Sequence, residues 1–299
     1  MLDCLFIGSI TKDTLLQVEA PPASDQRIAA SAVTHACGGI ASVAASAFQK
    51  LGGRGGLITA VGDASEVTDF IEANLAARNL PYLQLIRVPG TESPFSVIQV
   101  EADGKRCITC YGGCSRRLTM DMLDVKALSN AKMIHLGGLD EYFCGDLAAY
   151  CKRNTDALIS VDAGNLSREA TDRMLPYVDV FIPDDKTVTG TLGCSPEEAC
   201  RYYAEKGVRI SCVTMGDKGS VAYADGALHY AAPVRVPVTD TTGAGDNFHG
   251  AFLYCLMQGW DIERTLRFCN TFSALTCMGL GGLAAEPTLE ETLQKMEES

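Results

Sequence analysis

The sequence predicts an α/β fold, with a central, mostly parallel sheet flanked by helices and a small β lid. Short apolar segments alternate along most of the chain with segments of helical periodicity, which is the pattern of βαβ units around a parallel sheet. Four weakly alternating segments in the N-terminal part of the chain fall outside this pattern. We assign these four segments to the lid.

The composition is that of a globular protein able to bury a substantial core. The chain has 299 residues, of which 47% are apolar and 21% charged. It contains no internal repeat, low-complexity tract or linker, so we expect residues 1–299 to form one domain. The lid strands are expected within residues 12–36 and 92–113.

Charge and hydropathy argue against several classes of partner. A net charge of −12 does not suit a nucleic-acid surface, which needs clustered Lys and Arg. The longest uncharged run, residues 268–285, contains glycines and polar residues and makes a poor membrane span. No basic region precedes an apolar core at the N-terminus, so no secretory signal is expected. The odd number of cysteines, 13, is typical of a protein from a reducing cytoplasm.

The elements are assigned in chain order. Leu2–Ile7 predicts a buried parallel strand that turns at Gly8-Ser9. The helical spacing of apolar residues from Gly39 to Leu51 predicts the first helix. The lid segments are residues 14–19, 28–35, 93–101 and 105–111, with a hairpin turn at 102–104. Further strands are expected at 55–61, 132–136, 157–161, 178–182 and 209–214, and helices at 65–78, 144–154, 167–175, 195–206, 243–258 and 261–277.

A short turn before residue 246 is the strongest functional signal. Residues 234–238 have a β pattern, the turn contains Gly243, Ala244 and Gly245, and a helical pattern follows. Because these side chains are absent or small, backbone N–H groups at the helix start are free to bind an anion. Asp246 either caps the helix or removes a proton from a substrate hydroxyl while the amides receive a phosphoryl group. Placing an acid beside an anion site costs electrostatic energy, which favours the catalytic role.

Asp240-Thr-Thr-Gly-Ala-Gly-Asp246, followed by a helix of small residues, resembles the C-terminal signature of the ribokinase/PfkB family of sugar and nucleoside kinases. Asp13 after Gly8-Ser9, Gly38-Gly39 and Ala60-Val-Gly-Asp63 are similar to the other landmarks of the family, in the same order and spacing. The resemblance covers nearly the whole chain and points to the ketohexokinase and sulfofructose-kinase branch. It implies a ribokinase-like fold and an ATP-dependent, magnesium-using kinase of a small sugar. A homodimer paired through the lid is also expected, because open strand edges commonly pair between subunits.

The resemblance also implies the residues that bind substrates. Asp13 and the helix start at Gly38-Gly39 bind the acceptor, while Asp246 removes the proton from its hydroxyl. On the nucleotide side, the residues implied are Thr214, Gly216 and Gly219, which contact the phosphates, and Asn270 near the purine.

Two metal ions are expected by the same resemblance. Asp240 and the Thr242 carbonyl, with carbonyls of residues 279–283, are expected to hold a potassium ion. Many relatives carry Asn-x-x-Glu where this chain has Asp184 and Thr187, and that motif helps to organise magnesium through water. Its absence removes the usual side-chain contribution to the magnesium site.

Several positions leave the identity of the acceptor undetermined. Val43 stands where many family members have Asn, so one polar contact to the sugar is missing. Arg27 and Arg106, on or beside lid strands, either face solvent or bind an anionic group of the acceptor. The four histidines are spread singly, so we expect core or surface roles, although His249 lies one turn after Asp246.

Three alternatives remain beside the sugar kinase. A nucleoside kinase of the same fold is the nearest. A dinucleotide-dependent oxidoreductase is disfavoured because the turn after the first strand lacks Gly-x-Gly-x-x-Gly. A non-catalytic sugar or nucleotide sensor is disfavoured by the intact Asp246. The chain has no Gly-x-x-x-x-Gly-Lys-Ser/Thr sequence, so a P-loop cannot bind the phosphates.

Overall fold

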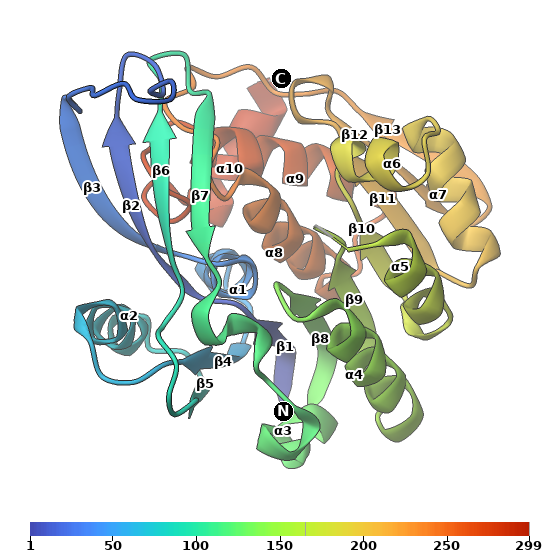
Figure 1. Ribbon diagram of the computed structural model, residues 1–299. Helices are drawn as coiled ribbons and strands as arrows, with labels where there is room; N and C mark the ends of the chain where they lie inside the picture. The colour runs from blue at the N-terminus through green and yellow to red at the C-terminus, as the bar shows by residue number, and fades with distance from the viewer. Residues whose placement is uncertain (165, 299) are drawn as a thin grey trace.

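The computed structural model describes residues 1–164 and 166–298, which form two sheets (Figure 1). The larger sheet has nine strands in the order β13-β12-β11-β10-β9-β8-β1-β4-β5. Every neighbouring pair from β5 to β11 is parallel, whereas β12 and β13 are antiparallel. The predicted α/β fold is therefore confirmed. The strands are β1 Leu2–Gly8, β4 Gly55–Val61, β5 Tyr82–Arg87, β8 Ala131–Gly137, β9 Leu158–Asp162, β10 Val180–Ile182, β11 Ile210–Thr214, β12 Ser220–Ala224 and β13 Ala227–Ala231.

Helices cover both faces of the larger sheet (Figure 1). Successive side chains of β1 point to opposite faces, so Phe6 joins the core on one side and Ile7 the core on the other. Full burial of a side chain of this size contributes roughly 1.5–3 kcal/mol. The helices on the Phe6 side are α1 Ile40–Lys50, α2 Glu66–Ala77, α8 Ala244–Met257, α9 Ile262–Thr276 and α10 Leu289–Glu298. Those on the Ile7 side are α3 Val125–Ser129, α4 Glu141–Asn154, α5 Arg168–Met174, α6 Asp185–Thr191 and α7 Pro196–Glu205.

The second sheet is the predicted lid, and it stands to one side of the larger sheet (Figure 1). Its strand order is β3-β2-β6-β7. The strands are β2 Thr11–Gln17, β3 Ala32–Gly38, β6 Phe95–Val100 and β7 Arg106–Tyr111. The hairpin predicted between β6 and β7 is confirmed. β2 begins at Thr11 rather than residue 14, and β3 begins at Ala32 rather than residue 28, because weak alternation defines strand ends poorly.

One strand prediction was wrong and several elements were not predicted. Residues 234–238 are not a strand in the structure, because Pro233 and Pro237 remove backbone donors from the segment. The unpredicted elements are β5, β12, β13, α3, α6 and α10. For the β12–β13 hairpin a signal was present, since Asp225-Gly226 is a favoured pair for a tight turn and both residues have positive φ, 51° and 81°. Within residues 1–164 and 166–298, no helix has the length and apolar character needed to cross a bilayer.

Candidate active site

The turn before α8 is held open by its glycines. Gly243 precedes α8 with a φ of 75°, and a Cβ there would lie 2.6 Å from the Cα of Gly282. Only glycine therefore allows the turn to lie against residues 279–283. At Gly245 a Cβ would have no heavy atom within 4 Å. The helix start is thus open to a ligand beside Gly245.

Backbone donors at this helix start are largely free. The Ala244 amide makes a long hydrogen bond of 3.3 Å to the Thr241 carbonyl. In the part of the chain that the structure describes, the amides of Gly243 and Gly245 have no hydrogen-bond acceptor. Free amides at the positive end of a helix dipole favour an anion. The half-buried carboxyl group of Asp246 lies in the same first turn.

Two buried side chains hold this turn against the loop that follows α9. Asp240 is 1% exposed, and one carboxylate oxygen accepts hydrogen bonds from the Thr242 amide and hydroxyl at 2.9 and 2.7 Å. The other oxygen accepts from the Gly281 amide at 2.8 Å. Asn247 donates to the carbonyls of Gly243 and Gly282 at 2.9 and 2.7 Å. Asn247 was not predicted, because an Asn in a helix carries no signal of what its side chain reaches.

On the lid, the Asp13 carboxyl group is 5% exposed and accepts a hydrogen bond from Oγ1 of Thr11 at 2.8 Å. A Cβ on Gly38 would lie 2.0 Å from Oδ2 of Asp13, so the glycine provides the space that the carboxyl group occupies. Burial raises the pKa of Asp13, although hydrogen bonds from Thr11 and Ser96 oppose the increase.

The backbone at the start of α1 is only partly available to a ligand. Gly39 has a φ of 95°, and a Cβ there would lie 2.5 Å from the Cα of Ile10. The next amide, of Ile40, donates to Oγ of Ser9 at 3.1 Å. Val43 is buried beside Gly282 and provides no polar contact.

The structure brings one of the two lid arginines to this region. Nη1 of Arg106 donates a hydrogen bond to Oγ1 of Thr241, in the turn before α8. Arg27 is exposed in the connection between β2 and β3. A positive charge from β7 therefore lies beside the amide turn.

The residues assigned to the nucleotide lie around the end of β11. Thr214 is its last residue, and Gly216 follows with a φ of 57°, where a Cβ would have no heavy atom within 4 Å. At Gly219 a Cβ would lie 2.1 Å from the Ala231 carbonyl oxygen. Asn270 donates to the carbonyls of Ala231 and Ala232 at 3.1 and 3.0 Å. The amide nitrogen of Asn270 thus fixes the chain at the end of β13.

Asp162 and the buried His249 act on the charge of Asp246, and a second buried histidine, His135, packs against His249. Burial and the charge of Asp162 raise the pKa of Asp246 to about 7, although His249 and Arg106 lower it. Nε2 of His249 lies 3.0 Å from Oδ2 of Asp162. The ring centroids of His249 and His135 are 5.2 Å apart. Core or surface roles were expected for the single histidines, and the pairing of His249 with His135 was missed because it depends on two distant segments meeting.

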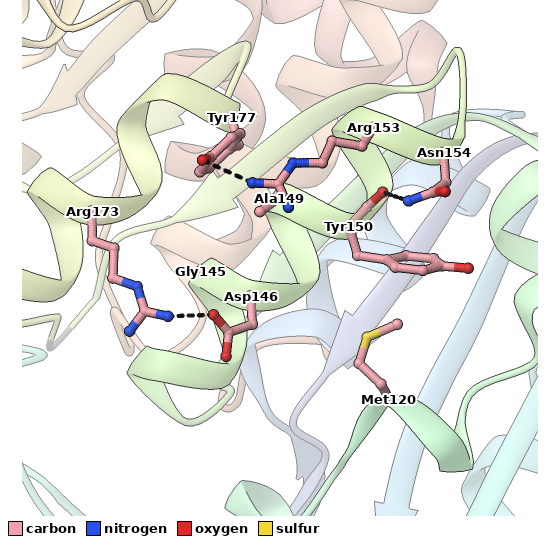
Figure 2. Close-up of a pocket in the computed structure, with 9 residues that line it drawn as sticks. All are labelled: Met120, Gly145, Asp146, Ala149, Tyr150, Arg153, Asn154, Arg173 and Tyr177. Carbon is pink, nitrogen blue, oxygen red and sulfur yellow. Dashed lines mark hydrogen bonds and ion pairs between the residues drawn. The ribbon is translucent and has the colours of Figure 1, made fainter.

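A separate hollow of about 470 Å³ lies along α4 and the segment after α5 (Figure 2). Both arginines that line it already have partners, since Arg173 donates to Asp146 at 2.5 Å and Arg153 donates to the Tyr177 hydroxyl at 3.0 Å. None of the residues assigned to catalysis lines this hollow. Its chemistry gives no reason to place the reaction there.

A carboxyl group beside free amides at a helix start provides an acceptor for a hydroxyl proton and donors for phosphoryl oxygens, which are two groups that phosphoryl transfer uses. The chain matches the model of the pfkB family carbohydrate kinases over residues 1–289, and it belongs to this family. The predicted family and the predicted ATP-dependent sugar kinase are therefore confirmed.

Individual relatives align with almost the full length of this chain. The chain is 26% identical over 302 residues to a deoxyribokinase from Salmonella typhi, covering 97% of each chain. It is 24% identical over 301 residues to a nucleoside kinase from Methanothermobacter thermautotrophicus, covering 98% of this chain and 95% of that protein. An Escherichia coli protein assigned as ribokinase II, solved with ATP and Mg²⁺, superposes with a TM-score of 0.84 at 21% identity over 100% of both chains. The fold is ribokinase-like.

Proposed function

We propose that this kinase transfers the γ-phosphoryl group of ATP to a hydroxyl group of a small sugar or sugar derivative. Asp13 and the start of α1 bind the acceptor, and Asp246 removes the proton from its hydroxyl. The amides of Gly243, Ala244 and Gly245 stabilise the negative charge on the phosphoryl oxygens. The lid excludes water, which would otherwise accept the phosphoryl group.

The open space beside Gly245 is the observation that supports this proposal most directly. A helix start with unoccupied amides accommodates an anion, and the Asp246 carboxyl group lies in the same turn as these amides. If Asp246 only capped α8, the backbone amides of this turn would not need to be free. Arg106, beside Thr241, adds positive charge on the lid side.

Magnesium is proposed to arrive with the nucleotide. Among the described residues, no group of three or more His, Cys, Asp and Glu is arranged to hold a metal ion. Asp184 caps α6 by accepting a hydrogen bond from the Thr187 amide at 2.6 Å. We propose that phosphate oxygens and water would hold the ion, because the Asp184 carboxylate is already used to cap α6. The ion would neutralise charge on the phosphates.

A potassium ion is proposed behind the amide turn, held by the Thr242 carbonyl and carbonyls of residues 279–283. Asp240, buried and bonded to both segments, provides the negative charge and fixes their spacing. An oxygen-only site suits such a hard cation. Replacing potassium with tetramethylammonium should lower turnover, and unchanged turnover would exclude the ion.

The assignment of Asp246 is tested by Asp246→Asn. We expect kcat to fall by at least ~10²-fold, the lower scale of general-base catalysis, with acceptor binding largely kept. The measurement is coupled ADP release together with calorimetric titration of the acceptor. Turnover near that of the wild type would contradict the proposal.

The same variant has a built-in control for folding. The pKa of Asp246 is raised in the folded protein, so its ionisation opposes folding above the pKa of the unfolded chain, about 4. Removing the charge should therefore raise Tm at pH 8 relative to the wild type, and change it little at pH 4. A kcat loss with a higher Tm separates lost chemistry from unfolding.

A nucleoside kinase is the second candidate, because a nucleoside kinase is among the relatives and Val43 leaves an apolar position next to Gly282. A coupled ADP-release screen over sugars, sugar acids, sugar phosphates and nucleosides distinguishes the two. Sugar-dependent ADP release with none for nucleosides supports the first proposal.

We also propose that the enzyme works as a cytoplasmic homodimer paired through the lid. All 13 cysteines are free, which suits a reducing compartment. Apolar side chains are exposed on one face of the lid: Val33, Phe95 and Tyr111.

A further inference from the structure

A buried polar pair beside Asp246 has no part in the reaction as proposed above. His249 is one turn after Asp246 on α8 and is only 4% exposed. Its Nε2 lies 3.0 Å from Oδ2 of Asp162, at the end of β9. Oδ1 of Asp162 accepts a hydrogen bond from the Gly164 amide at 2.8 Å. The ring is therefore fixed through Nε2, and the carboxylate that holds it is itself fixed.

A second buried histidine packs against the ring of His249. Nδ1 of His249 and Nε2 of His135 are both buried without a hydrogen-bond partner within the described ranges. The two ring centroids lie 5.2 Å apart, and Nδ1 of His135 is 3.1 Å from Oγ of Ser160. Burial lowers the pKa of His135 to about 3, so this ring is neutral. His135 therefore packs against His249 as a neutral ring and adds no second positive charge.

Ionisable groups from several elements face the pair and Asp246. They are Asp13 on β2, Arg106 on β7, His135 on β8, Asp162 on β9 and Cys144 on α4. Burial raises the pKa of the Cys144 thiol to about 12, so it is uncharged. The carboxylates of Asp162 and Asp13 oppose ionisation of Asp246. Arg106, on an exposed lid strand, favours it.

The buried His249 ring carries a positive charge one turn from the half-buried Asp246. Burial disfavours a charged ring, but the carboxylate of Asp162 and its hydrogen bond outweigh this and raise the pKa of His249. The charge of His249 in turn outweighs the effect of burial and lowers the pKa of Asp162. A buried ion pair of this kind costs desolvation energy, so it is a poor choice for stability alone.

We propose that His249 is a positioning residue for the reaction: held as a cation by Asp162, it keeps Asp246 ionised while substrates displace water from the site. The inference rests on the role proposed for Asp246. When water leaves, a carboxylate near Asp13 and Asp162 tends to take up a proton, and a protonated acid is no longer a base. The buried cation offsets one of these negative charges.

The test is His249→Gln, in which the side-chain amide still donates to Asp162 but carries no charge. With magnesium in excess, we expect the acidic limb of the kcat/KM profile against pH to move up by about one pH unit, which is roughly a tenfold loss on the acidic side. The high-pH plateau should stay within about threefold of the wild type. His229→Gln, on β13, is the matched control and should leave the limb in place.

An unshifted acidic limb in a folded His249→Gln protein would overturn the inference, even if Tm falls, because a purely structural role changes stability and not the limb. Should this variant fail to fold, nitrogen-15 NMR of the wild-type histidines decides. His249 should keep its proton to a higher pH in the wild type than in Asp162→Asn, because the Asp162 carboxylate raises the pKa of the ring. A neutral His249 in the wild type at pH 7 would overturn the inference.

The roles proposed for Asp246 and His249 fail in distinguishable ways. If Asp246 is not the base, Asp246→Asn retains turnover. If only the role of His249 is wrong, Asp246→Asn loses turnover while His249→Gln keeps the wild-type limb.

Discussion

At the level of single residues, the glycines around the candidate site have different structural roles. Gly38 makes room for the Asp13 carboxyl group, and Gly243 allows two loops to touch. Gly245 has neither constraint, since a Cβ there would meet no neighbour within 4 Å and its φ lies outside the positive range. Its lack of a side chain would be explained by the phosphoryl group proposed to lie in this open space.

Gly245→Ala is therefore expected to fold normally and to lose activity. The added methyl group would occupy the space proposed for the phosphoryl oxygens, so kcat should fall by at least ~10-fold, about 1.4 kcal/mol of transition-state stabilisation. Thermal denaturation and coupled ADP release measure the two effects. Gly190→Ala, in α6 with equally open surroundings, is the matched control and should leave kcat unchanged. Equal kcat in both variants would argue against the anion site.

Asp13 is a residue that could be chosen as a candidate from its type and its place along the chain. Its place after the first strand marked it as a candidate, and the structure adds that it is buried on a lid strand against Gly38. The pairing of His249 with Asp162 had no counterpart in sequence, because it depends on α8 lying across the end of β9. Long-range contacts of this kind leave no local pattern.

Among the secondary-structure elements, the turn before α8 and the loop after α9 are connected by Asp240. Its two oxygens accept hydrogen bonds from both segments, and the Gly281 amide that it satisfies is buried. The Asp240 carboxylate therefore connects the helix start to the loop after α9.

Asp240→Ala should destabilise the protein by about 1–3 kcal/mol, because it leaves the buried Gly281 amide without an acceptor. Chemical denaturation measures this loss. Asp121→Ala removes an exposed carboxylate that accepts from the Thr119 hydroxyl, and its effect should stay within about 0.5 kcal/mol. Equal stability of the two variants would show that Asp240 does not hold the loops together.

Most elements with strong periodicity were predicted, although α10 was missed while Leu289, Leu293 and Met296 repeat at helical spacing. The buried parallel strands are short apolar runs, and α1, α2, α7, α8 and α9 repeat apolar residues at helical spacing, so their existence followed from the chain alone. β5 is a half-exposed edge strand with little pattern, and residues 234–238 have a β pattern that two prolines prevent from pairing.

In the molecule as a whole, the lid has one face toward the site and one toward solvent. Leu15 and Ile98 pack inward, whereas Val33, Phe95 and Tyr111 are 59, 37 and 47% exposed on the other face. The Phe95 and Tyr111 rings lie 5.4 Å apart and form one continuous apolar patch. An apolar strand face of this kind is suited to a second subunit.

Sedimentation equilibrium should therefore show a dimer for the wild type and a monomer for the double variant Val33→Glu and Tyr111→Glu. Each charge would be buried in the proposed interface, whereas in the folded monomer both positions are exposed. Val125→Glu, at a similarly exposed apolar position on α3, should remain dimeric. A monomeric wild type would exclude pairing through the lid.

Local patterns in the chain were enough to establish the α/β class, the lid hairpin, the kinase family and the turn that carries Asp246, because each depends on periodicity or on residues adjacent in the chain. The folded arrangement was needed to establish which groups surround that turn. Arg106 approaches from β7, Asp162 and His249 pair beside Asp246, and Asp240 joins two loops. Their electrostatic effects depend on distance through space, and separation along the chain does not encode that distance.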